Sequence, residues 1–186
     1  MIYGCGRNFK ALQARFRRGG IIAYPTESCF GLGCDPRNYR AVVKLLRLKK
    51  RPLDKGLILV AGELKAFNAW ISTLPPNLTA QLQKKYRPPC TWLVPPGRLA
   101  SRAILGKHKR IAVRVTAHAQ AARLSRDLHT PLVSTSANRA GKRPLRSARA
   151  VRRAFGKQVT IARGRVGREK KPSIIRDLLT HNTIRS

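Results

Sequence analysis

Short apolar segments of strand length alternate with amphipathic segments of helix length along this chain. Residues 21–24, 57–60 and 91–94 are largely apolar runs of about four residues, which are too short for a buried helix and typical of strands inside a sheet. Residues 40–49 and 117–128 instead carry apolar side chains at three- and four-residue spacing, which indicates helices with one buried face. This alternation predicts an α/β fold with a mixed sheet covered by helices on both sides.

The same patterns predict the remaining elements. We expect irregular structure in the basic residues 100–110 and in the Gly- and Arg-rich residues 164–171. The other expected helices cover residues 8–18, 63–70, 77–85 and 147–155, and the other expected strands cover residues 111–115, 132–135, 159–162 and 173–177.

Length and composition favour one domain over residues 1–186. No apolar run approaches the ~20 residues that span a bilayer, and residues 1–12 lack the apolar segment of a signal peptide. The four cysteines (Cys5, Cys29, Cys34 and Cys90) form no C-x-x-C pair and have no histidine at metal-ligand spacing, which argues against a zinc site. We therefore expect a cytoplasmic protein with reduced thiols and no membrane partner.

The charge of the chain is extreme, because 40 Lys and Arg residues face only 7 Asp and Glu residues, giving a formal charge of +33. One explanation is an anionic partner, above all tRNA or another RNA, since clustered cations release counterions from phosphates. The other is a basic surface, natural or engineered, that has no partner. The cations are spread along the chain, which fits a basic surface better than a nucleic-acid-binding arm.

The segment over residues 20–35 combines a buried strand with a possible ligand site. The apolar run ends at Pro25, and Thr26 and several glycines follow. A strand that stops at a proline and opens into a Gly-rich turn would expose backbone groups and hydroxyls at a sheet edge. Such an edge suits a ligand.

Lys49 and Arg51 lie two residues apart at the end of a predicted helix. Pro52 disfavours helical geometry at Arg51, and side chains two apart in extended chain point the same way. Both cations could then contact one anion, such as a triphosphate or a carboxylate. The alternative is a solvated helix end that the helix dipole stabilises.

Ser134 and Ser136 are also two residues apart, at the end of a buried strand, and Asn138 follows at the turn. Their hydroxyls could face one pocket, where the amide offers both a donor and an acceptor. The alternative is that these residues simply cap the strand end or the next helix.

Arg114 interrupts an apolar strand and needs an anionic partner if it is buried. That partner could be a phosphate or one of the rare acids, such as Glu27 or Asp35, unless the strand is at an edge and the arginine is solvated. Thr26, Thr91 and Ser173 could add hydroxyls at strand–proline boundaries. Neither a P-loop nor a Rossmann glycine motif is present, and the four histidines are expected at the surface.

Six groups of residues are informative when they are taken together, in their order along the chain. They are Tyr24-Pro25-Thr26-Glu27 with Gly31-Leu32-Gly33, Lys49-x-Arg51-Pro52 with Lys55-Gly56-Leu57, Thr91, Ala112-Val113-Arg114-Val115, Ser134-Thr135-Ser136-Ala137-Asn138 with Gly141, and Pro172-Ser173 with Arg176-Asp177. Together they resemble the YrdC-like family, whose bacterial members are threonylcarbamoyl-AMP synthases. The resemblance covers nearly the whole chain and is to the short, single-domain form.

This resemblance implies a three-layer fold with a twisted mixed sheet and a concave basic face. It implies a reaction of L-threonine, bicarbonate and ATP, with magnesium, that yields threonylcarbamoyl-AMP and pyrophosphate for threonylcarbamoyladenosine modification of tRNA by a downstream transferase machinery. The magnesium would be carried by ATP, because no direct metal motif is present. The alternative is a noncatalytic protein of the same fold that binds double-stranded RNA or tRNA.

The resemblance also implies roles for the candidate residues. The cations Lys49, Arg51 and Arg114 would hold phosphates or carboxylates, with Lys49 and Arg51 as the catalytic pair. The polar residues Thr26, Thr91, Ser134, Ser136, Asn138 and Ser173 would shape the threonine and nucleotide pocket. One departure from the family pattern stands before Thr91, where Arg87-Pro88 replaces the usual Pro-Gly and removes a backbone donor.

Overall fold

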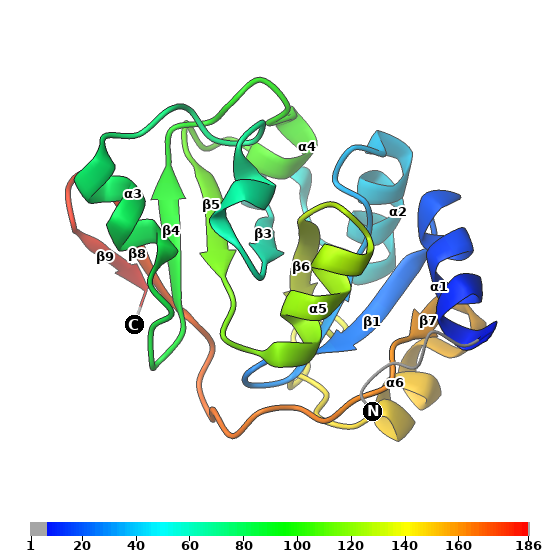
Figure 1. Ribbon diagram of the computed structural model, residues 1–186. Helices are drawn as coiled ribbons and strands as arrows, with labels where there is room; N and C mark the ends of the chain where they lie inside the picture. Colours follow the sequence, from blue (N-terminus) through cyan, green and yellow to red (C-terminus); the bar gives the residue numbers. More distant parts are fainter. Residues whose placement is uncertain (1–6, 186) are drawn as a thin grey trace.

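The computed structural model describes residues 7–185, and these residues form one nine-stranded sheet with helices packed against it (Figure 1). The strand order is β7-β1-β2-β6-β3-β5-β4-β8-β9. The strands are β1 Ile21–Pro25, β2 Phe30–Gly33, β3 Ile58–Ala61, β4 Cys90–Val94, β5 Ile111–Val115, β6 Leu132–Ser136, β7 Val159–Ile161, β8 Ile174–Asp177 and β9 Thr183–Arg185. Three pairs (β7–β1, β3–β5 and β4–β8) are parallel and the other five are antiparallel, so the prediction of a mixed sheet is confirmed.

Six α-helices and three short 3₁₀ helices occur in the described part of the chain. The α-helices are α1 Arg7–Arg17, α2 Tyr39–Lys49, α3 Pro76–Gln83, α4 Arg102–Leu105, α5 Ala119–Asp127 and α6 Ala148–Phe155, and the 3₁₀ helices are η1 Leu53–Lys55, η2 Leu64–Phe67 and η3 Gly156–Gln158. In this part of the chain, no helix is long and apolar enough to cross a membrane.

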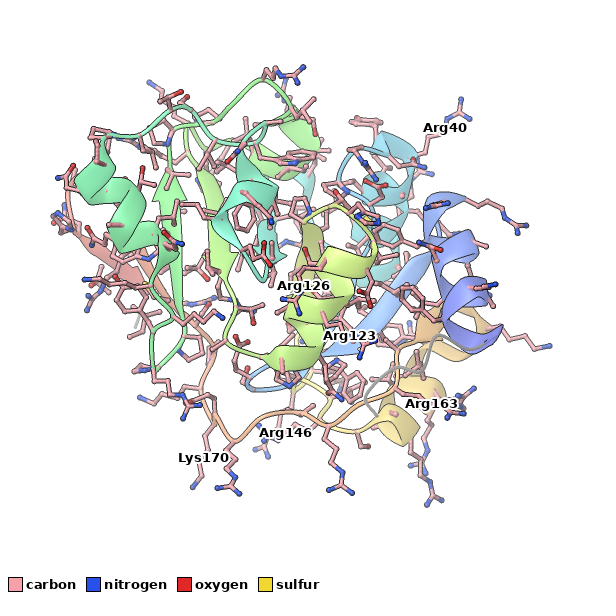
Figure 2. All side chains as sticks on the ribbon, in the orientation of Figure 1. Arg40, Arg123, Arg126, Arg146, Arg163 and Lys170 are labelled. Atoms are coloured by element: carbon pink, nitrogen blue, oxygen red, sulfur yellow. The ribbon has the colours of Figure 1, made fainter. Side chains whose placement is uncertain are left out.

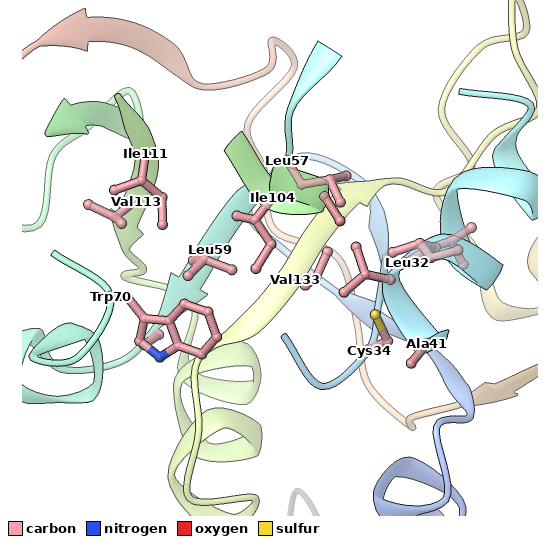
Figure 3. Close-up of a cluster of buried hydrophobic side chains, with 14 of the residues drawn as sticks. Leu32, Cys34, Ala41, Leu57, Leu59, Trp70, Ile104, Ile111, Val113 and Val133 are labelled. Carbon is pink, nitrogen blue, oxygen red and sulfur yellow. The ribbon is translucent and has the colours of Figure 1, made fainter. Parts of the chain in front are cut away.

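Side-chain alternation along β1 divides the hydrophobic interior into two cores, one on each face of the sheet. Ile21 and Ala23 belong to the larger core, whereas Ile22 and Tyr24 belong to the smaller one, as expected when successive side chains point to opposite faces. Helices α2, α3, α4 and α6 contribute to the larger core, part of which Figure 3 shows. Helices α1 and α5 cover the smaller core. Helices therefore cover both faces, as predicted.

The prediction of a Gly-rich turn after Pro25 is wrong in part. The chain turns at residues 26–29 and then forms strand β2, which lies between β1 and β6 in the interior of the sheet, away from its edges. Phe30 and Leu32 fill the larger core, while the glycines face the other side. A Cβ on Gly33 would lie 2.2 Å from the carbonyl oxygen of Val133, so glycine is required here because two strands approach closely.

Two smaller predictions are also corrected, and one strand was missed. Residues 102–105 form helix α4, because Ala103 and Ile104 are buried in the larger core. Within the expected helix 63–70, only the 3₁₀ turn η2 forms. Strand β9, which the sequence did not suggest, pairs with β8 at the edge of the sheet.

Candidate active site

A cavity of about 160 Å³ opens on the sheet face opposite the larger core. Its walls come from the β1–β2 turn, the Arg51–Ile58 region, β5, the end of β6, the start of β8 and β9. Cavities for drug-sized ligands are roughly 300–1,000 Å³, so this space suits a molecule of amino-acid size, and a nucleotide would extend from it into the open side. A larger depression beside η2 gathers none of the candidate residues.

Six of the nine predicted site residues line this cavity: Thr26, Arg51, Arg114, Ser134, Ser136 and Ser173. They come from five parts of the chain that the sheet brings together. The other three, Lys49, Thr91 and Asn138, are not among the lining residues and lie behind them.

Three guanidinium groups, from Arg51, Arg114 and Arg185, converge on the cavity. Burial lowers the pKa of Arg51, and the positive charge of Arg185 lowers it further, although Asp54 opposes the shift. Burial and the charge of Arg114 lower the pKa of Arg185. These arginines repel one another, and an anion bound among them would relieve that repulsion.

Glu27 is the acid that pairs with Arg114, as one of the sequence alternatives proposed. Its Oε2 lies 3.6 Å from a guanidinium nitrogen of Arg114, and its Oε1 accepts a hydrogen bond of 2.5 Å from the Thr116 hydroxyl. Burial alone would raise the pKa of Glu27, but the Arg114 charge and the Thr116 hydrogen bond outweigh it and hold the pKa below its ordinary value. One carboxylate therefore offsets only part of the positive charge of three arginines.

The hydroxyls at the cavity are held by specific partners. Thr26 donates to the carbonyl oxygen of Cys29 at 2.7 Å, and Ser136 donates to the side-chain oxygen of Asn138 at 2.7 Å. The hydroxyls of Ser173 and the fully buried Thr91 lie 2.8 Å apart. Thr91 thus supports Ser173 from behind and does not line the cavity itself.

Lys49 is buried beneath the turn that follows β6. Helix α2 ends at Lys49 because Lys50 adopts the left-handed conformation that stops a helix. The Lys49 ammonium donates to the carbonyl oxygens of Ser136 at 2.6 Å and Asn138 at 2.8 Å, and to the Asn138 side chain at 2.7 Å. Burial, together with the nearby Arg51, lowers the pKa of Lys49 to about 8. In this arrangement Lys49 fixes the position of Ser136.

Residues 162–173, which we call the strap, connect β7 to β8 along one side of the molecule (Figure 1). The strap backbone donates from Gly167 to the Thr26 carbonyl at 2.9 Å and from Glu169 to the Glu27 carbonyl at 3.1 Å. Arg146 donates to carbonyl oxygens of Ser28, Gly167 and Glu169. The strap is therefore fixed to the β1–β2 turn, and its end places Ser173 in the cavity.

Sequence reasoning missed several residues that line the cavity, including Arg185, Ser28 and Cys29. Arg185 lies in the three-residue strand β9, which is too short to show an apolar pattern typical of a strand. Ser28 and Cys29 lie within a motif that the sequence singled out, but nothing in their type distinguished them from ordinary turn residues.

The donor set does not form a metal site. No group of three or more His, Cys, Asp and Glu side chains gathers among residues 7–185. The carboxylate beside the cavity, Glu27, already accepts a hydrogen bond from Thr116 and forms an ion pair with Arg114. Hydroxyls and guanidinium groups suit phosphates and carboxylates better than a divalent cation.

Comparisons with known proteins agree with this geometry. The family model Sua5_yciO_yrdC, described as "Telomere recombination", matches residues 14–186. A protein of Thiobacillus denitrificans named threonylcarbamoyl-AMP synthase is 45% identical over 94% of this chain and 93% of its own length. A protein of Methylobacillus flagellatus with the same name is 47% identical over 95% of this chain and 98% of its own.

Solved structures share the fold. P. abyssi Sua5 in complex with L-threonine superposes with a TM-score of 0.80 at 27% identity, over 92% of this chain. This chain spans about half of that protein, 51% of its length. E. coli YciO gives a TM-score of 0.76 at 24% identity, over 96% of this chain and 87% of its own, which supports the fold alone.

Proposed function

The chain belongs to the Sua5/YciO/YrdC family, and on that premise we propose that it makes threonylcarbamoyl-AMP from L-threonine, bicarbonate and ATP. Pyrophosphate and water are the other products, and the threonylcarbamoyl group is destined for adenosine in tRNA. The observation that carries the proposal is the cavity, in which three arginines and several hydroxyls converge on a space of amino-acid size.

The chemistry requires alignment more than proton transfer. The threonine nitrogen first takes up the carbon of bicarbonate with loss of water, and an oxygen of the resulting carbamate then attacks the α-phosphorus of ATP while pyrophosphate leaves. Carbamate, carboxylate and triphosphate are all anions that repel one another. Arg51, Arg114 and Arg185 neutralise these anions at fixed positions, which lowers the barrier by orientation and charge stabilisation.

The hydroxyl residues would determine which amino acid is accepted. Thr26, Ser134 and Ser173 lie around the same space as the arginines and can hydrogen-bond the carboxylate, amine and hydroxyl of threonine. Lys49 and Asn138 would act from behind the residues that line the cavity, by holding the turn that carries Ser136. Magnesium would arrive with the triphosphate of ATP, because residues 7–185 offer no carboxylate cluster for it. We further propose that the enzyme acts in the cytoplasm and supplies a transferase that acts on tRNA.

The test is release of pyrophosphate from ATP, measured with and without L-threonine and bicarbonate. We expect release that requires both, and we expect Arg185→Gln to lower kcat/KM at least about tenfold, since a tenfold loss corresponds to about 1.4 kcal/mol of lost transition-state binding. Arg176→Gln is the matched control, because Arg176 is exposed on the adjacent strand β8 and does not line the cavity. Release that ignores threonine, or equal losses in the two variants, would contradict the proposal.

A further inference from the structure

Residues 139–171 form the most basic part of the chain, and we call this stretch the basic segment. It contains thirteen Lys and Arg residues and a single acid, Glu169, so about a third of all cations lie in less than a fifth of the sequence. The segment includes helix α6 and most of the strap. We propose that its exposed face is a docking surface for the phosphate backbone of structured RNA, separate from the cavity that holds the small substrates.

Parts of the basic segment that are distant in sequence are joined by hydrogen bonds. The Arg146 guanidinium joins the loop before α6 to the strap through the carbonyls of Gly167 and Glu169, and Arg139 donates to the Ala154 carbonyl in α6 at 3.1 Å. Figure 2 shows the side chains of Arg146, Arg163 and Lys170 along the lower edge of the molecule, near α6 and the strap. Cations of the strap and of the loop before α6 therefore lie on segments that contact each other.

The charges on α6 are not compensated within the protein. Arg149, Arg152 and Arg153 are exposed, and α6 contains no acid. In the part of the chain that the structure describes, none of these three lies within 4.0 Å of a carboxylate oxygen, whereas the exposed arginines of α5 are paired: Arg123 with Asp127 and Arg126 with Glu63. Like charges three or four residues apart destabilise a helix, and a bound polyanion would remove that repulsion.

The packing of α6 favours a nucleic acid over a membrane as the partner. Its apolar side chains, Val151 and Phe155, are buried in the larger core, so no apolar face remains to enter a bilayer. Guanidinium groups match phosphate oxygens in bidentate geometry. The choice of RNA rests on the proposed function, whose product is used on tRNA.

The basic segment also contacts a residue that lines the cavity. Ser28 and Pro172 line the cavity, and Arg146 bonds to the carbonyl of Ser28. RNA bound along the strap and α6 would thus lie close to the cavity in which we propose that threonylcarbamoyl-AMP is made. Phosphate contacts of this kind position a nucleic acid without reading its sequence.

The experiment compares two double variants that each remove two exposed arginines three residues apart on a helix. Arg149→Gln/Arg152→Gln removes unpaired charges from α6, and Arg123→Gln/Arg126→Gln removes paired charges from α5. The probe is an unmodified tRNA transcript, with its binding constant measured over a series of salt concentrations. We expect the α6 variant to weaken binding at least about tenfold at low salt and to reduce the slope of log K against log salt by roughly 1.4–1.8, or 0.7–0.9 per lost phosphate contact. The α5 variant should change binding less than about twofold.

Several results would overturn the proposal. Equal losses in the two variants would mean that the charge acts diffusely, and equal affinity for a DNA duplex of the same length would remove the assignment to RNA. Loss of binding to vesicles containing phosphatidylserine, with tRNA binding retained, would identify a lipid surface instead. Pyrophosphate release measured on the same samples separates the two proposals. Release should be unchanged in both variants. If the wild-type protein releases no pyrophosphate, the proposed enzymatic function is refuted, but the RNA-binding result can still be interpreted.

Discussion

Replacing Glu27 with glutamine would test the charge balance of the cavity directly. The substitution keeps the size of the side chain and its contact with Thr116 but removes the partner of Arg114. The Glu27 and Arg114 side chains are 9% and 10% exposed, and their charged atoms are 3.6 Å apart. At an effective dielectric constant of about 20 this attraction amounts to about 4–5 kcal/mol, part of which is offset by the cost of burying the carboxylate.

We therefore expect Glu27→Gln to lower the free energy of unfolding by about 3 kcal/mol, as measured by urea denaturation without ligand. Pyrophosphate should stabilise the variant more than the wild-type protein, because Arg114 is then free to bind an anion and the cavity carries one more positive charge. A tenfold lower dissociation constant would add about 1.4 kcal/mol to the stabilisation by saturating ligand. The pKa of Glu27 is lowered, so its contribution to stability exists above the ordinary carboxyl pKa and disappears as the pH falls through the lower, folded-state value.

Asp35→Asn is the matched control for this experiment. Asp35 is also a buried acid with an arginine partner, Arg37 at 2.7 Å, but it does not line the cavity. It should lose stability without changing the response to pyrophosphate. If the two variants respond to pyrophosphate alike, or if Glu27→Gln responds less than the wild-type protein, the assignment of Arg114 to anion binding is wrong.

Two further predictions concern Lys49 and Gly33. The pKa of Lys49 is lowered from 10.5 to about 8, so the unfolded chain binds more protons than the folded protein between these two values. The wild-type protein should therefore gain stability relative to Lys49→Met as the pH rises through that window. Urea midpoints of the two proteins that change with pH in parallel would contradict the assignment. Gly33→Ala should destabilise the protein by roughly 1–3 kcal/mol or more, because its Cβ would overlap the Val133 carbonyl. The comparison is Gly141→Ala, where the Cβ meets open space and only the backbone strain of φ +73° remains.

The sequence predicted the regular part of the fold well, because each element carried its own pattern. Strand β3 and helix α2 could be placed to within a residue or so from apolar periodicity alone. Strand β2 could not, because two of its four residues are glycines whose purpose is to let neighbouring strands approach. That requirement belongs to the packed sheet and leaves no local signal.

The candidate site divides in the same way. Arg51, Arg114 and Ser134 were predicted because each is a polar residue at the end of an apolar pattern or within it, and all three line the cavity. Lys49 and Thr91 were predicted for the same reason, but they do not line the cavity: Lys49 holds the turn with Ser136, and Thr91 holds Ser173. A sequence shows which polar residues are near the core, and only the register of the sheet decides which of them face the ligand.

The seven acids help to explain how a chain with a charge of +33 can keep a specific site. Five of them form ion pairs: Glu27, Asp35, Glu63, Asp127 and Asp177. Asp177 also accepts hydrogen bonds from the backbone of residues 179 and 180. Acids thus remain mostly where a defined cation or turn needs them, including the one beside the cavity.

The surface, in contrast, carries cations that nothing in α6 offsets. Self-repulsion among such charges destabilises the compact state, and it is relieved either by salt or by a bound polyanion. The Glu27–Arg114 ion pair is buried, so the cavity can retain its geometry beneath a basic surface. The two proposals together give one small domain a site for small anions in its cavity and a surface for a large anion on its outside, and Arg146 donates hydrogen bonds both to Ser28 beside the cavity and to the strap.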